Sequence, residues 1–260
     1  MFVRSASLAA FACLGFFIAG SAAARQGAAQ TAPVARPPVA DPVVVEMFLS
    51  QACQASPPAV DSLRKLAGRN DVIALSWHVD YWNDTPSKDG GVWGDPYSRP
   101  EFTARQKFYN KRIRGRGTVL TPQAVIDGFL SVAGSDLSRI DAGIHEAQLA
   151  DELSRAIPPA IKITGFDVHG LSVAVSGVGA PYDAYLVTFR PTASTRVKGG
   201  DNAGFEFNEI NVVTDSAKIA SEHKGPGVFV APAPAPGLGC AVLVQERAQG
   251  RIVAARYCGR

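Results

Sequence analysis

The sequence predicts an α/β domain followed by an all-β domain of antiparallel, sandwich-like architecture. From about Val43 to Leu153, apolar runs of strand length alternate with segments of helical spacing. From about Pro158 to Arg260, short alternating runs are separated by turn residues, and helical spacing is weak. The 260 residues, of which 47% are hydrophobic, suffice for two such domains, which we place at residues 43–155 and 158–260.

The first part contains strands and helices in alternation. Continuous apolar strands joined by helical crossovers are typical of a sheet that is covered on both faces. Ser56 is a candidate cap of the first helix, and Pro57 suits its first turn. In chain order we expect the strand Val43–Phe48, the helix Pro57–Leu66, the strand Val72–Val79, the helix Glu101–Arg112, the strand Ala124–Asp127 and the helix Asp136–Leu153.

The second part reads as a series of short strands. The stretch "APAPAPG" is expected to be an extended surface loop between two of them. In chain order the expected strands are Ile161–Asp167, Leu171–Ser176, Ala184–Arg190, Phe207–Val213, Ala241–Glu246 and Ile252–Tyr257.

The last two strands predict a disulfide. A hairpin centred on Ala248-Gln249-Gly250 places Cys240 directly opposite Cys258, and cross-strand neighbours lie near disulfide reach. Such a bond would stabilise the protein by about 3 kcal/mol. Two buried free thiols are the alternative.

The N-terminus resembles a secretory signal peptide, which we place at residues 1–24. Arg4 provides the positive charge, the run from Leu8 to Ile18 is apolar, and small residues precede a cut after Ala24. Residues 25–42, rich in Ala and Pro, read as a linker. A permanent membrane anchor is the rival interpretation, but the apolar run is short for a span. We therefore expect a periplasmic or secreted protein without a stable membrane anchor, in a compartment that permits disulfides.

If the signal peptide that contains Cys13 is removed and Cys240 bonds to Cys258, Cys53 is the remaining thiol. It is the candidate catalytic residue. It stands between an apolar strand and the start of a helix, where unpaired amide donors and the helix dipole favour a thiolate over a thiol. The thiolate is the nucleophile of disulfide exchange. Ser56, three residues on, is a candidate hydrogen-bond donor to it. A free cysteine in a loop is more often only packed, and that interpretation stays open.

A further segment supplies candidate groove residues. In "LSWHVDYWND", His78 and Asp80 share a face of the strand by its two-residue period, and Trp82 follows. His78 is a candidate base or electrostatic partner for Cys53, oriented by Asp80. We slightly favour the alternative, in which both residues tie the strand end to the loop. A copper or zinc site using Cys53, His78 and Asp80 or Asp84 is chemically allowed, but no spacing requires a metal or cofactor.

Several motifs occur in a recognisable order: "SQACQASPP", "HVDYWND", "WGDPYSRPEFTARQKFY" and "TPQAVIDG". They resemble an exported bacterial family known as domain-of-unknown-function family 1223. The resemblance implies a thioredoxin-like α/β domain followed by a β-rich domain. It also implies that Pro122 follows a cis peptide bond and faces Cys53, with Thr121, Pro122 and Gln123 shaping a peptide groove. The segment "GGDNAGFEFNEINVV" resembles a family segment less closely.

The chain departs from the usual family pattern at two positions. Ala52 stands where the family has Gly, and Ser56 stands where it generally has a second cysteine. Without that resolving thiol, Cys53 cannot close a disulfide with its neighbour, and an outside thiol must release any mixed disulfide. This leaves isomerase-like or glutathione-type exchange, or the trapping of partners.

The leading hypothesis is therefore monothiol thiol–disulfide exchange with exported proteins or small thiols through Cys53. The alternatives are a non-catalytic binding or scaffold protein at the cell envelope and a copper or zinc carrier. Nucleic acid is not an expected partner, because 26 basic against 23 acidic residues give a net charge of only +3 without a basic cluster.

Overall fold

The computed structural model describes residues 42–154, 157–167 and 170–259. The signal peptide predicted at residues 1–24 lies outside the described residues, as does the linker predicted at residues 25–42 except for Pro42. Among the described residues, no helix combines the length and the apolar character needed to cross a membrane.

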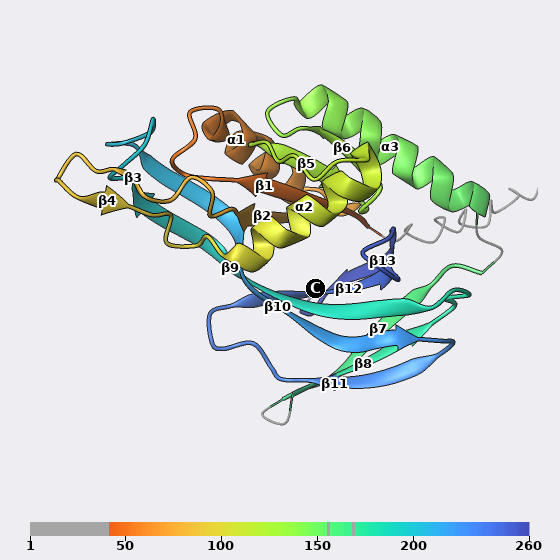
Figure 1. Cartoon of the computed structure of the whole chain (residues 1–260). Coiled ribbons are helices and arrows are strands. Elements are labelled where there is room, and N and C mark those ends of the chain that lie inside the picture. The colour runs from red at the N-terminus through yellow and green to blue at the C-terminus, as the bar shows by residue number, and fades with distance from the viewer. Residues whose placement is uncertain (1–41, 155–156, 168–169, 260) are drawn as a thin grey trace, which may run out of the picture. The chain divides into compact units, whose positions relative to one another are not determined.

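One eight-stranded mixed sheet forms the centre of the fold (Figure 1). Its strand order is β13-β12-β9-β10-β2-β1-β5-β6. β1 and β2 are parallel, β5 and β6 continue the sheet antiparallel to β1, and β10 pairs with the other side of β2. The bounds are β1 Val43–Leu49, β2 Val72–His78, β5 Gln123–Ile126, β6 Leu130–Ala133, β9 Tyr182–Arg196, β10 Glu206–His223, β12 Gly239–Glu246 and β13 Ile252–Tyr257.

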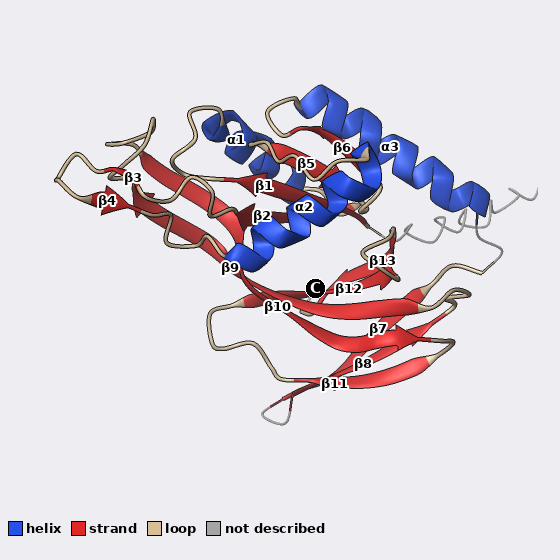
Figure 2. Ribbon diagram, in the orientation of Figure 1, coloured by secondary structure: helices blue, strands red, loops and turns tan. Residues whose placement is uncertain are grey.

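Three helices cover the part of the sheet around β1 (Figure 2). They are α1 Ser56–Ala67, α2 Pro100–Arg114 and α3 Leu137–Ser154. α1 and α3 share one apolar core with Val45 and Met47 of β1, whereas α2 shares a second core with Val44 and Phe48. Successive residues of a strand face opposite sides, so the continuous apolar run of β1 serves both cores.

A smaller three-stranded sheet of order β11-β8-β7 packs against the C-terminal strands of the large sheet. The core between them contains Val173 of β8, Leu186 of β9 and Val242 of β12. The bounds of the remaining strands are β7 Ala160–Asp167, β8 Gly170–Ser176, β11 Gly227–Ala231, and the short pair β3 Thr85–Pro86 and β4 Val92–Trp93.

The predicted fold class, a thioredoxin-like α/β domain followed by an all-β domain, is wrong. The chain is mostly β, and its main sheet is continuous, because Val212 of β10 lies opposite Ser76 of β2 in parallel register. β9 and β10 are 15 and 18 residues long, much longer than the alternating runs that predicted them. The joining residue Val212 lies within the predicted strand Phe207–Val213, so the prediction failed in how this strand pairs and not in where it lies in the chain.

The hairpin of β12 and β13 has the register derived from its turn. Ala241 pairs with Tyr257, and Cys240 and Cys258 are joined by a disulfide with a Cα–Cα distance of 5.4 Å. Cys53 is the free cysteine of the described residues.

Candidate functional site

Cys53 lies in the loop between the end of β1 and the start of α1. Its amide N–H donates to the Ser50 carbonyl at 3.2 Å, and its own carbonyl accepts from the Ser56 N–H at 3.0 Å. The residue is only 4% exposed, while Gln54 and Ala55 directly after it are exposed. The first turn of α1 contains no acidic side chain, so nothing there offsets the positive end of the helix dipole.

The sulfur of Cys53 contacts the backbone of the segment that precedes β5. Its Sγ lies 3.7 Å from the carbonyl oxygen of Thr121, whose peptide bond to Pro122 is cis. The Trp82 Nε1–H donates to the Thr121 Oγ1 at 2.8 Å. These contacts place Thr121, one of the predicted groove residues, beside Cys53, and two others, Pro122 and Trp82, next to Thr121.

Tyr81 lies between the predicted groove residues Asp80 and Trp82 but was not itself among them. Its hydroxyl donates to the Gln106 Oε1 at 3.2 Å. Burial raises the pKa of Tyr81 to about 12, and the charges of Cys53 and Asp80 act in the same direction. The phenol therefore stays protonated at neutral pH, with its hydroxyl bonded to Gln106.

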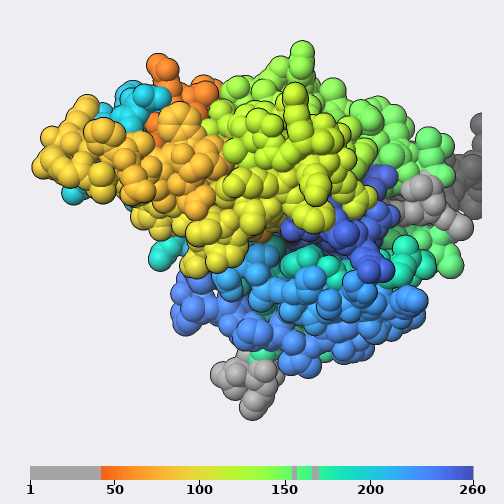
Figure 3. Space-filling model, viewed as in Figure 1, coloured from red at the N-terminus to blue at the C-terminus, as the bar shows by residue number. Residues whose placement is uncertain are grey.

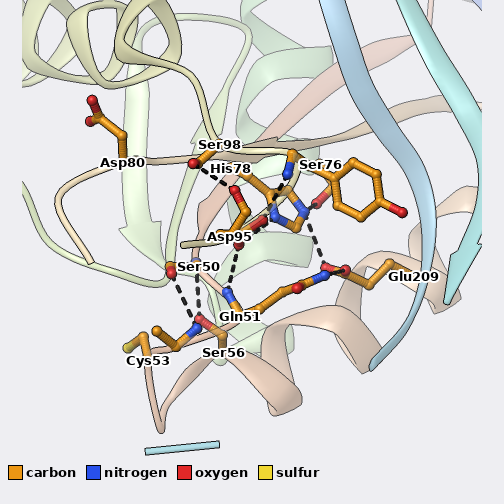
Figure 4. Close-up of polar contacts among 12 residues, drawn as sticks. Ser50, Gln51, Cys53, Ser56, Ser76, His78, Asp80, Asp95, Ser98 and Glu209 are labelled. Carbon is orange, nitrogen blue, oxygen red and sulfur yellow. Dashed lines mark hydrogen bonds and ion pairs between the residues drawn. The ribbon is translucent and has the colours of Figure 1, made fainter. Parts of the chain in front are cut away.

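Ser56 has a different partner from the one expected. Its Oγ accepts the Ser50 N–H at 3.3 Å, and the residue is fully buried. The hydroxyl thus helps to shape the loop before Cys53, as Figure 4 shows.

His78 lies in a buried charged cluster. Its Nδ1 is 2.8 Å from the Asp95 Oδ2, and its Nε2 is 3.1 Å from the Glu209 Oε1 (Figure 4). Burial opposes the charged imidazolium, but Asp95 and Glu209 outweigh it and hold the pKa of His78 well above its ordinary value. Burial also opposes the Asp95 carboxylate, yet His78 and backbone N–H groups leave the pKa of Asp95 below its ordinary value. An imidazolium that donates to the Asp95 carboxylate and forms an ion pair with Glu209 is not available as a base for Cys53.

Asp80 and Gln123 also bond away from the sulfur. The Asp80 Oδ1 accepts from the Thr103 Oγ1 at 2.5 Å, so it does not orient His78. Gln123 is fully buried, and its amide bonds to Gln106 and Asn110. Of the predicted groove residues, His78, Asp80 and Gln123 therefore tie elements of the fold together.

Sequence reasoning missed the residues that hold the Cys53 loop in place. The Gln51 N–H donates to the Asp95 Oδ2 at 2.9 Å, and the Gln51 Nε2 donates to the Glu209 Oε2 at 2.6 Å. From the β9–β10 connection, the Asn202 Nδ2 donates to the carbonyls of Gln51 and Cys53 at 2.9 and 2.7 Å. The signal available was the "GGDNAGFEFNEINVV" segment, which contains both Asn202 and Glu209.

Gly200 provides a test of the contact between the β9–β10 connection and the Cys53 loop. Its φ is +72°, and a Cβ there would lie 2.7 Å from the Ala52 Cβ. We expect Gly200→Ala to lower the free energy of unfolding by about 1–3 kcal/mol. It should also speed the modification of Cys53 by iodoacetamide, because the loop must move.

Gly237→Ala is the matched control, since Gly237 has a φ of +82° but a Cβ added there would meet nothing within 4 Å. Denaturant unfolding and alkylation rates would be compared for the two variants. Equal losses of stability and an unchanged Cys53 rate would show that the β9–β10 connection does not hold the loop.

Cys53, His78, Asp80 and Asp84, the residues considered as metal ligands, do not form a metal site. Among residues 42–154, 157–167 and 170–259, no set of three or more His, Cys, Asp and Glu side chains is arranged to hold a metal ion.

The fold and the site together define a class of protein: a mixed eight-stranded sheet in which the loop after β1 carries the free cysteine of the described residues and is bonded to a connection from the C-terminal half. The chain belongs to the family described as protein of unknown function (DUF1223), whose pattern matches residues 44–245. The crystal structure of protein AGR_C_4864 from Agrobacterium tumefaciens is similar, with 29% identity and a TM-score of 0.68, over 84% of this chain and 94% of that one. HBP35 of Porphyromonas gingivalis is similar in fold alone, with 11% identity and a TM-score of 0.53, over 84% of this chain and 74% of that one. No curated protein matches the chain.

Proposed function

We propose that the protein is exported and performs monothiol thiol–disulfide exchange through Cys53, with exported proteins or small thiols as partners. The observation that carries the proposal is the setting of this one free cysteine among the described residues. Its sulfur lies 3.7 Å from the Thr121 carbonyl oxygen, in the loop directly before α1. The helix N-terminus supports a reactive thiol over a merely packed one, whereas the Thr121 carbonyl accepts from the S–H and has to give way when the thiolate forms.

The proposed reaction has two balanced steps. The Cys53 thiolate attacks one sulfur of a partner disulfide, forms a mixed disulfide with it, and releases the other sulfur as a thiolate. An outside thiolate then attacks the mixed disulfide, releases Cys53 and carries away the partner sulfur in a new disulfide. Because Ser56 has no thiol, the outside thiol is required for turnover.

The burial of Cys53, which is only 4% exposed, restricts the kind of partner that can reach its sulfur. The open approach runs along the exposed Gln54 and Ala55 and the half-buried Thr121. A small disulfide or an extended peptide segment fits this approach better than a rigid folded surface. Thr121 and Trp82 would then contact the partner chain.

The proposal is tested by adding oxidised glutathione to the full exported chain and following its intact mass. We expect the mass of one glutathione to be added to the native protein, and none to Cys53→Ala. Ser56→Ala should still form the adduct, because Ser56 is not the resolving group. The native chain should react at least about as fast as the urea-unfolded chain, whose thiol is fully accessible.

A native chain that reacts far more slowly than the unfolded one would overturn the proposal and favour the non-catalytic scaffold. Partners in the exporting cell would be sought by rapid alkylation, followed by a search for mixed disulfides that are absent in Cys53→Ala.

A further inference from the structure

A separate cavity lies between the start of α2 and strands β2, β9 and β10. Its volume is about 270 Å³, and its walls include Trp77, Arg105, Tyr185, Asp215 and Gln249. Figure 3 shows α2, in yellow to yellow-green, lying against the blue C-terminal strands on the face in view. The volume equals that of about nine water molecules, so the cavity suits a small polar ligand. None of the residues that contact the Cys53 sulfur lines it.

Two buried polar atoms in its walls have no hydrogen-bond partner among the described residues. One is the indole Nε1–H of Trp77, a donor on a fully buried side chain. The other is the amide Oε1 of Gln249, an acceptor. Buried polar groups are normally paired, and an orphaned group costs about 1–3 kcal/mol. A ligand that carries both an acceptor and a donor would satisfy the two atoms together.

A cation stands beside the orphaned donor. Arg105 is 6% exposed, and its guanidinium carbon lies 5.2 Å from the centre of the Trp77 ring. Its Nε and Nη2 bond to Glu46, Tyr109 and Gln245, whereas its Nη1 makes no hydrogen bond within the described part of the chain. The Arg105 Nη1 and the Trp77 Nε1 are thus two N–H donors, unpaired within the described chain, on residues of the cavity wall, and carboxylate oxygens are the acceptors that such donors bind best.

The exposed rim carries charges of both signs. Arg99 provides a second positive charge, and Glu101 and Asp215 provide two negative charges. None of these three side chains forms an ion pair with another described residue. A simple anion would face the two rim carboxylates unpaired, and a simple cation would face the two arginines.

We infer that this cavity binds a small zwitterion of the free α-amino acid class. The ligand's carboxylate lies toward Trp77 and Arg105, and its ammonium group lies toward the Gln249 carbonyl and the carboxylates of Asp215 and Glu101. The inference does not depend on the chemistry of Cys53.

The test is isothermal titration calorimetry of the full exported chain with glycine, L-alanine, L-serine and L-glutamine. Acetate and ethylammonium serve as the two halves of the ligand. We expect at least one amino acid to bind at least about tenfold more tightly than either half. Asp215→Asn should weaken that binding by at least about tenfold. Asp215 is exposed, so the variant should fold.

Glu146→Gln is the matched control, because it removes one exposed carboxylate on α3, away from the cavity. It should leave binding unchanged. Trp77→Phe, checked for folding by circular dichroism, should weaken the binding of both the amino acid and acetate. The absence of binding by all four amino acids would overturn the inference, as would acetate binding as tightly as they do, or equal binding by Asp215→Asn and the wild type.

Discussion

His78→Gln should lower the free energy of unfolding by about 3–5 kcal/mol at neutral pH. The side chains of His78 and Asp95 are fully buried and that of Glu209 is 1% exposed, so the substitution would leave two carboxylates in the interior without a cation. The loss should also loosen the Cys53 loop, because Gln51 bonds to both Asp95 and Glu209. We therefore expect faster alkylation of Cys53 in this variant.

Urea denaturation followed by circular dichroism measures the effect. His145→Gln is the matched control, since His145 is exposed on α3, and it should change stability by less than about 0.5 kcal/mol. A small loss in His78→Gln, similar to that of the control, would mean that the cluster is not held by charge.

The same cluster predicts a pH dependence. The native pKa of His78 is raised above 6.5, so its contribution is fully present below pH 6.5 and is lost as the pH rises through the native pKa. The native pKa of Asp95 is lowered below 3.8, so its contribution is present above pH 3.8 and is lost as the pH falls through the native pKa. The cluster therefore contributes most to the free energy of unfolding between about pH 3.8 and pH 6.5. The loss of stability that His78 causes at higher pH should be absent in His78→Gln.

Local patterns predicted the three helices and most of the longer strands, but not β3, β4, β6 and β11. The register of the β12–β13 hairpin follows from its turn, which is why Cys240 could be placed opposite Cys258. The apolar run of β1 and the cap region of α1 are likewise local. The joining of β10 to β2 is not local, because it pairs Val212 with Ser76, far apart in the chain, and depends on which sheet edge is left open. The two-domain fold class failed at that step.

The candidate site likewise has one part that neighbouring residues predict and one part that depends on residues far apart in the chain. The place of Cys53 at the end of a strand and the start of a helix could be read from neighbouring residues. The partners of His78 could not, since Asp95 comes from a loop and Glu209 from a strand of the other half of the chain. The two-residue period suggested Asp80 instead, but its carboxylate is taken by Thr103 of α2. Glu46 was a signal that was overlooked, because a charge inside a buried apolar strand requires a partner.

That partner is Arg105, and the pair gives the second large prediction. Glu46 is fully buried, and its carboxylate accepts from the Arg105 Nε at 2.6 Å, from the Arg105 Nη2 at 3.1 Å and from the Tyr109 hydroxyl at 2.5 Å. Burial opposes the charged guanidinium, but Glu46 outweighs it and raises the pKa of Arg105. We expect Arg105→Met to lower the free energy of unfolding by about 3–5 kcal/mol, because the Glu46 charge would be left without its cation. Arg105→Lys should recover little, since a lysine cannot supply two parallel N–H donors or stack on the Trp77 and Tyr109 rings as the guanidinium does.

A double-mutant cycle separates the charge from the packing. Glu46→Leu combined with Arg105→Met removes both charges and keeps apolar volume, and buried pairs replaced in this way often cost little. The double variant should therefore be more stable than Arg105→Met alone, with a coupling energy of about 2 kcal/mol or more in urea denaturation. Additive losses would show that the two side chains act separately, through the rings around Arg105 and through Tyr109. A large coupling would instead mean that one buried ion pair fastens α2 to β1, the strand that ends at Cys53.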